Sequence, residues 1–143
     1  MTTISKSALV SYSPEQMFRL VDDIESYAEF LPWCGKATEI SRDEKNVEAS
    51  IFISYSGVNK EFTTQNKNTA FEKIEMRLVN GPFKNLDGVW LFEPLGENAC
   101  KVSLNLEFEF SSKIISVTLG PVFSLIANSL VDAFIKRADT VYG

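Results

Sequence analysis

The sequence predicts an α+β domain in which a curved antiparallel sheet of seven strands packs around one long C-terminal helix. Two observations support this fold class. Between about residues 34 and 110, short runs of alternating apolar and polar residues are separated by polar or glycine-containing turns, with no helical pattern between them. From Ser112 to Tyr142 the apolar residues recur instead at steps of three and four, which is typical of a helix. The expected order is β-α-α-β6-α in a single domain, residues 1–143.

The N-terminal part predicts one strand and a well-capped helix. Residues 2–12 are expected to form the first strand. Ser13 is a typical N-cap, Pro14 fits the first helical position, and Gln16 lies where a capping box needs its partner. The helix is expected to end near Asp22. Its apolar face contains Met17, Phe18 and Val21.

The hexapeptide FLPWCG, residues 30–35, marks the exit from a second short helix. Asp23 is expected to cap this helix and Pro32 to end it, because the residue before a proline resists the α conformation. Cys34 has no histidine partner and no basic neighbour closer than Lys36, so a catalytic or redox role is not expected. The apolar side chains here form either a lip over one end of a cavity or a plug at the helix end. They are Phe30, Leu31 and Trp33.

Six further strands are expected to form an antiparallel meander, because turn signals separate them and no helix intervenes. The first of them follows the hexapeptide and ends at a polar turn, residues 41–46. The last shows the clearest alternation of apolar and polar residues. The five strands after the polar turn are expected at residues 48–56, 61–69, 73–79, 84–94 and 100–110.

Large apolar side chains on one face of these strands and on the C-terminal helix are the candidate lining of a cavity. A twisted sheet curves, and a curved sheet that grips one helix often leaves an apolar space of the kind that binds small ligands. The pattern is equally compatible with a filled core. Gly88 on the same face is expected to mark a bend or the close approach of another group. The candidates are Met76, Phe83, Leu86, Trp90, Phe92, Leu104, Leu106 and Phe108 in the sheet, and Leu119, Phe123, Ile126 and Leu130 in the helix.

Several polar side chains have two interpretations. Three of them share a strand face with Phe62: Thr64, Asn66 and Asn68. If that face points inward they would contact a ligand's polar head group, but a solvated, outward orientation is favoured. Glu107 and Glu109 are interpreted as exposed carboxylates, not as an acid–base pair. Arg137 is interpreted as a charge that complements the helix dipole, with anion recognition as the alternative.

The C-terminal helix contains an uncharged stretch, Ile114–Val131, that is nearly long enough to span a membrane. Gly120–Pro121 is expected to kink the helix. Polar residues continue through the stretch, so a helix that covers an apolar tunnel is favoured over a membrane span. Transient contact with a membrane surface is compatible with this interpretation.

The composition argues against several classes of function. The chain has no histidine, which excludes Ser-His-Asp and Cys-His catalysis and removes the commonest metal ligand. A net charge of −5 argues against generic nucleic-acid binding, and no DNA partner is expected. The N-terminus shows no signal or transit peptide, so a cytoplasmic protein with reduced Cys34 and Cys100 is expected.

Three motifs together resemble the coenzyme Q-binding, polyketide-cyclase-like family of START-type proteins. They are FLPWC after two short helices, GPFKNLDGVWLFEP, and the ending AFIKRADTVYG, and the resemblance covers nearly the whole chain. The resemblance implies the helix-grip fold, a hydrophobic tunnel for an isoprenoid quinone or similar lipid, and neither catalysis nor a cofactor. For the ribosome-association toxin branch of the family, it implies binding to the large ribosomal subunit, which blocks joining with the small subunit.

Three functions are compatible with these observations. The favoured function is non-enzymatic binding of a hydrophobic ligand, a ubiquinone-type quinone, in support of respiration. The alternative is the ribosome-association toxin, to which the acidic pI of about 4.8 lends no electrostatic support. A polyketide cyclase or aromatase is the least favoured, because without histidine it would depend on Tyr12, Tyr55 or a buried carboxylate.

Overall fold

The structure, a computed structural model, describes residues 1–143 and has the expected β-α-α-β6-α order. The first strand ends at Val10, earlier than the expected residue 12, because the chain turns at Ser11. The elements are β1 (Thr2–Val10), α1 (Pro14–Asp22), the short helix η1 (Ile24–Glu29), β2 (Cys34–Arg42), β3 (Asn46–Tyr55), β4 (Val58–Thr69), β5 (Lys73–Asn80), β6 (Phe83–Pro94), β7 (Cys100–Phe110) and α2 (Lys113–Tyr142).

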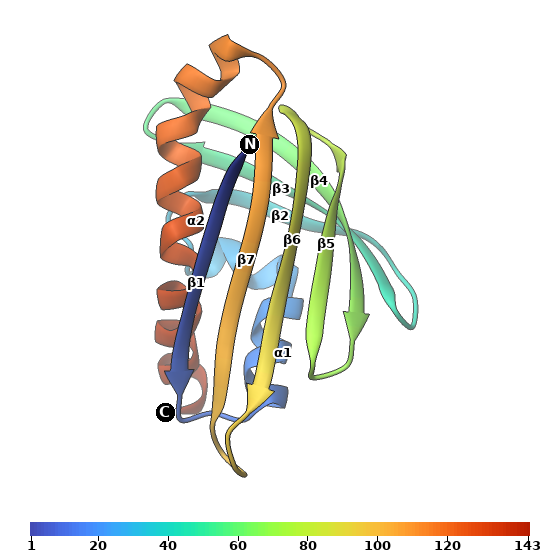
Figure 1. Ribbon diagram of the computed structural model, residues 1–143, viewed down its shortest axis with the longest axis vertical. Coiled ribbons are helices and arrows are strands. Elements are labelled where there is room, and N and C mark those ends of the chain that lie inside the picture. The colour runs from blue at the N-terminus through green and yellow to red at the C-terminus, as the bar shows by residue number, and fades with distance from the viewer.

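The seven strands form one antiparallel sheet in the order β1-β7-β6-β5-β4-β3-β2. Strands β2 to β7 follow one another as a meander, and β1 pairs with β7 at the far edge. In Figure 1 the strands β1, β7, β6 and β5 lie in front, while β4, β3 and β2 curve behind them toward α2. Helix α2 contacts β7, β1, β4 and α1, so the sheet wraps around it as a helix-grip fold requires.

Helix α1 begins with the predicted capping box. The Ser13 hydroxyl accepts a hydrogen bond from the Gln16 backbone N–H at 3.2 Å, and the Gln16 side chain accepts one from the Ser13 backbone N–H at 2.8 Å. Pro14 occupies the first turn, where its missing N–H costs nothing. The three predicted apolar residues of α1 are buried: Met17, Phe18 and Val21.

The second short helix differs from the prediction in its type and its cap. It is a 3₁₀ helix, and no side chain caps its N-terminus. Asp23 has φ −85° and ψ 71°, outside the extended geometry that lets a side chain reach the next backbone N–H groups. Its carboxylate accepts instead from the Ser26 hydroxyl at 2.7 Å.

A polar clasp formed by Asp22, Arg42 and Asn68 fixes the C-terminus of α1 to the sheet. The Asp22 carboxylate accepts from the Arg42 guanidinium at 3.1 Å and from the Asn68 side-chain amide at 2.8 Å. Arg42 lies on β2 and Asn68 on β4, so the clasp joins the C-terminus of α1 to two separate strands. Asn68 therefore faces Asp22 at the strand end, and it is not a cavity residue.

Helix α2 runs along the open side of the curved sheet. Its inner face is buried at Leu119, Phe123, Ile126 and Phe134. Pro121 lies inside the helix, where it lacks the N–H that would bond to the preceding turn and its ring crowds that turn. The first turns of α2 tilt away from the direction of the remaining helix in Figure 1, at the end that follows β7.

Candidate ligand cavity between the sheet and the long helix

A small apolar cavity lies between the inner face of the sheet, η1 and α2. Its volume is about 80 Å³, and 16 of its 18 lining residues are hydrophobic. Small-molecule sites commonly enclose about 300–1,000 Å³, so a lipid-sized ligand requires the walls to move apart. Nine of the candidate residues named from the sequence border it: Trp33, Met76, Leu86, Trp90, Leu104, Leu106, Phe123, Ile126 and Leu130.

Six candidate residues do not border the cavity, which differs from the expected lining: five lie elsewhere in the core and Phe30 is half-buried against it. Phe92 stacks on Trp90 with ring centroids 6.4 Å apart and meets the edge of Phe18. Phe83 and Phe108 pack against Phe123 at 4.9 and 4.8 Å. Alternation identifies the inner face of a strand but not the position along it where packing is incomplete. The six are Phe30, Leu31, Phe83, Phe92, Phe108 and Leu119.

Nine lining residues were not predicted from the sequence. Two of them, Ala49 and Ile51, lie on a strand whose alternation was recognised, but they were not selected as lining residues. Ile24 and Tyr27 lie on η1. Nothing in the local sequence predicts that they border the cavity, because only the tertiary fold brings η1 next to it. The nine are Ile24, Tyr27, Ala49, Ile51, Phe62, Thr64, Asn66, Ala127 and Phe134.

The favoured outward orientation of Thr64 and Asn66 is wrong. Both line the cavity, and their exposed fractions are only 5% and 8%. Their register explains the orientation, because Thr64 pairs with Ala49 and Asn66 pairs with Met76, two inward residues of the neighbouring strands. The sequence feature that could have predicted the inward orientation was Phe62, which shares their strand face and is itself buried. The Thr64 hydroxyl donates to the Asn66 side-chain oxygen at 3.0 Å.

Gly88 brings two cavity side chains close to the β6 backbone, which confirms the expected close approach. A Cβ atom at this position would lie 2.7 Å from Met76 Cε and 2.8 Å from Leu106 Cδ1. Real Cβ atoms do not tolerate such distances, so a larger residue would push one of these side chains away. Glycine therefore allows the two side chains to close over β6 on the cavity side.

The segment expected as a lip is divided between the cavity and the core. Trp33 borders the cavity, whereas Leu31 is fully buried in the core. Phe30 is half-buried and meets the edge of Phe134, a lining residue, with ring centroids 5.3 Å apart. The Arg137 guanidinium lies over the Phe30 ring, 4.8 Å from its centroid.

The role of Arg137 also differs from the expectation. Its guanidinium pairs with the Glu29 carboxylate at 3.0 Å, which ties α2 to the end of η1. It is not in the last turn of α2, and the ion pair occupies the group that would recognise an anion. Arg137, Glu29 and Phe30 thus close the outer side of the aromatic wall.

The cavity contains no group that is charged at neutral pH. Tyr27 is its only titratable lining residue, and burial raises the pKa of this phenol far above its ordinary value. The Tyr27 hydroxyl donates to the Val21 carbonyl, so it remains a neutral phenol. The enzyme candidates Tyr12 and Tyr55 lie outside the cavity. The site is therefore suited to binding an uncharged ligand.

The two cysteines are buried apart from any basic partner, and the carboxylates do not gather into a cluster. Cys34 and Cys100 are free and buried, and burial raises the pKa of both thiols, that of Cys100 to about 11. No group of three or more His, Cys, Asp or Glu side chains is placed to hold a metal ion. Glu107 is exposed on the outer face of β7 and Glu109 is half-buried.

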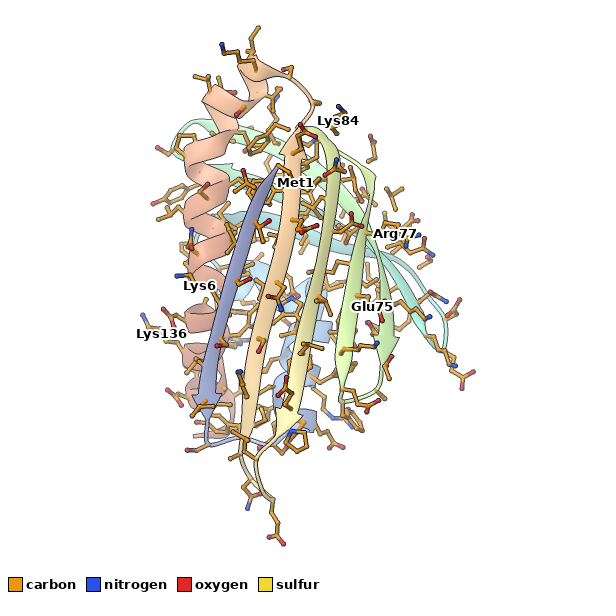
Figure 2. The ribbon with its side chains drawn as sticks, in the orientation of Figure 1. Met1, Lys6, Glu75, Arg77, Lys84 and Lys136 are labelled. Carbon is orange, nitrogen blue, oxygen red and sulfur yellow. The ribbon has the colours of Figure 1, made fainter.

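The outer face of the sheet carries a broad polar hollow of about 910 Å³. Glu75 and Arg77 point outward from β5 in this region (Figure 2). The hollow contains three basic side chains and three acidic ones, so it is not a basic patch. The charged residues are Lys67, Lys73 and Arg77, and Glu75, Asp87 and Glu107.

By length and composition, α2 is apolar enough to cross a membrane, and 28% of its most apolar window is buried in the structure. Exposed apolar side chains concentrate in its first half, where Ile114 is 76% and Val117 is 69% exposed. Contact of this strip with a membrane surface stays a prediction.

Comparison with known proteins identifies the family. The family described as "Polyketide cyclase / dehydrase and lipid transport" matches residues 10–135. The ribosome association toxin RatA of Vibrio cholerae is 50% identical over 143 residues, which is 100% of this chain and 99% of that protein. The coenzyme Q-binding protein COQ10 homolog B of Xenopus laevis is 27% identical over 97% of this chain and 59% of that protein.

The solved structures share the fold. A protein from Thermus thermophilus superposes with a TM-score of 0.84 over 99% of this chain and 100% of that one, at 18% identity. The match of the family model to most of the chain, together with the RatA relative at half identity, settles the assignment. The chain belongs to the polyketide cyclase / dehydrase and lipid transport family.

Proposed function

We propose that the protein is a RatA-type ribosome-association toxin that binds the large ribosomal subunit and prevents it from joining the small subunit. The observation that carries this proposal is the 50% identity to a RatA protein over the full length of both chains. This reverses the order of preference drawn from the sequence, in which quinone binding came first. The proposed site of action is the cytoplasm, where free subunits assemble.

The charge distribution supports a contact that does not depend on a large basic surface. The chain has a net charge of −5, and the broad outer hollow balances its basic and acidic side chains. One of the two adjacent basic residues near the C-terminus, Arg137, is already paired with Glu29. We therefore propose shape-dependent contact with a ribosomal protein or a limited RNA surface, in place of general attraction to phosphates.

Sucrose-gradient sedimentation tests this function. Purified protein added to a lysate should shift ribosomal material from intact ribosomes to free subunits, and the protein should migrate with the large subunit. An unrelated acidic protein of similar size and charge is the control for non-specific effects. Unchanged peaks over a wide range of protein concentration would reject the proposal.

The second candidate function is binding of a hydrophobic ligand, an isoprenoid quinone or similar lipid. It is favoured by the apolar, uncharged cavity and by the distant relative named as a coenzyme Q-binding protein. The two functions are compatible, because the cavity is internal. The cavity's small volume means that such a ligand must displace flexible side chains such as Met76.

Native mass spectrometry of freshly purified protein tests ligand binding. The expected result is a population with added mass, from which organic solvent extracts a lipid or quinone. If the protein is always free of added mass and added decylubiquinone does not bind, the second function is wrong. The proposal includes no catalytic step and no cofactor, because the lining supplies only Thr64, Asn66 and neutral aromatic groups as polar contacts.

A further inference from the structure

Asn66 offers an unpaired hydrogen-bond donor to the apolar cavity. Its side chain is more than nine-tenths buried, with 8% exposed, and it borders the cavity. The Asn66 side-chain oxygen accepts from the Thr64 hydroxyl at 3.0 Å. The Asn66 side-chain nitrogen donates to no protein acceptor, and it is not among the fully enclosed unpaired atoms, which are Asn68 Oδ1 and Asn85 Oδ1.

Thr64 and Asn66 together have more hydrogen-bond donors than their mutual bond uses. This holds even if the oxygen and nitrogen of the Asn66 side-chain amide are exchanged. An asparagine amide carries two N–H hydrogens and a threonine hydroxyl carries one. The bond between Thr64 and Asn66 occupies one of these hydrogens in either arrangement. The remaining two lie beside a cavity whose other lining residues are apolar or aromatic. A donor that no protein acceptor satisfies gains a hydrogen bond when a ligand in the cavity supplies an acceptor.

The absence of charge in the lining determines which acceptor fits. No lysine, arginine or histidine borders the cavity. A buried carboxylate would therefore lose its hydration without gaining a counter-ion, which is far more costly than the burial of a neutral oxygen. A pure hydrocarbon would leave the Asn66 donors unpaired. A neutral carbonyl oxygen avoids both penalties.

We propose that the cavity selects uncharged apolar ligands that carry a carbonyl oxygen, and that the Asn66 side-chain N–H donates to this oxygen. The inference rests on the second proposed function, the binding of a hydrophobic ligand, and specifies its chemistry. Asn66 pairs in register with Met76, and the flexible Met76 side chain is the adjustable wall beside the donor. The carbonyl end of the ligand lies here, and its apolar part extends toward α2.

The test uses three probes of equal chain length that differ only at one end: a methyl ketone, an alkane and a fatty acid. Each displaces Nile red from the full-length protein at neutral pH, and the fluorescence decrease gives its relative affinity. The wild-type protein should prefer the ketone to the alkane by about threefold to tenfold, the range expected for one net hydrogen bond. The fatty acid should bind more weakly than the ketone.

Three variants assign the preference to the donor. Asn66→Leu should abolish the preference for the ketone, whereas Thr64→Val keeps the amide donors and should retain it. Asn105→Leu is the matched control on the outer face of β7, where it cannot reach the cavity. Thermal unfolding shows which variants are folded, and the comparison of probes on the wild-type protein needs no variant.

The possible failures are distinguishable. If none of the probes, Nile red included, binds the folded protein, the ligand-binding function itself is wrong. If the probes bind but the wild-type protein binds the alkane or the fatty acid as well as the ketone, only the inference about the carbonyl is overturned. A ketone preference that persists in folded Asn66→Leu also overturns it, because the donor would then lie elsewhere.

Discussion

At the scale of single residues, the cavity depends on positions where size and polarity are closely constrained. Gly88 permits Met76 and Leu106 to approach the β6 backbone, and Thr64 with Asn66 places polar hydrogens inside an apolar wall. Neither feature strengthens the fold by itself. Glycine weakens a strand and buried polar groups lower the gain from burial, so both are better explained by the shape and chemistry of the cavity.

Replacement of Gly88 by alanine should fill part of the cavity and strain its wall. The new Cβ would lie 2.7 Å from Met76 Cε, so the methionine side chain has to move. We expect the free energy of unfolding to fall by about 1 kcal/mol, the low end for overpacking, because alanine also suits a strand better than glycine. Urea unfolding measures this change. Asp87→Ala, at the neighbouring outward position, should leave the free energy of unfolding nearly unchanged, and an equal fall in both variants would contradict the account.

The buried thiol of Cys100 predicts a loss of stability at alkaline pH. Burial raises its pKa from an ordinary value of 9.0 to about 11. The folded state therefore holds a proton that the unfolded state releases, and stability present below pH 9 is lost as the pH rises toward 11. Between pH 9 and pH 11, the free energy of unfolding should fall less steeply with rising pH for Cys100→Ala than for the wild-type protein. Identical slopes would show that the thiol does not contribute.

At the scale of elements, the short helices and α2 are held by contacts between segments distant in sequence. The clasp of Asp22, Arg42 and Asn68 fixes the C-terminus of α1 to β2 and β4, while the pair Arg137–Glu29 joins α2 to η1. These contacts position Tyr27 and Trp33 against the cavity.

Removal of the clasp should loosen η1 without unfolding the sheet. Asp22→Ala removes the shared acceptor and leaves the Arg42 guanidinium and the Asn68 amide without it. We expect a loss of about 1–2 kcal/mol in the free energy of unfolding, since the hydrogen bonds are charge-assisted but partly exposed. Hydrogen exchange should accelerate in residues 24–30. Glu15→Ala removes an exposed ion pair with Arg19 and a carboxylate from the first turn of α1, so as the control it should lower the free energy of unfolding by less than about 1 kcal/mol and leave exchange in residues 24–30 unchanged.

The exposed apolar strip at the start of α2 predicts reversible contact with anionic membranes. Ile114 and Val117 protrude there, and Lys113 begins the helix. Lys84 lies at the same end of the molecule (Figure 2), because Phe83 pairs with Phe110 just before α2. Sedimentation with phosphatidylserine vesicles should recover the protein, and Ile114→Ser with Val117→Ser should reduce the recovery.

Val141→Ser is the matched control for the membrane prediction, because Val141 is a 50% exposed apolar residue at the opposite end of α2. It should leave recovery with vesicles unchanged. Equal binding by the wild-type protein and the double variant would contradict a role for the strip. Lys84 and Lys113 are expected to attract anionic lipids. If neutral vesicles recover as much protein as anionic vesicles, this attraction does not contribute to binding.

At the scale of the whole molecule, the fold was predictable because its signals are periodic. The alternation in β5, β6 and β7 and the helical spacing in α2 each identify an inward face. The cavity was only partly predictable, since Phe92 and Phe108 share that face yet pack tightly with other aromatic rings. Thr64 and Asn66 were misassigned because polarity favours solvent unless the register of the neighbouring strands places a residue inward.

The proposed function at this scale is interference with the assembly of ribosomal subunits, and light scattering during subunit joining tests it most directly. Large subunits incubated with the protein before small subunits are added should show a smaller and slower rise in scattering as the protein concentration increases. Incubation of the small subunits alone with the protein, followed by its removal, should leave joining normal. Full-amplitude joining at saturating concentrations of folded protein would contradict the proposed function.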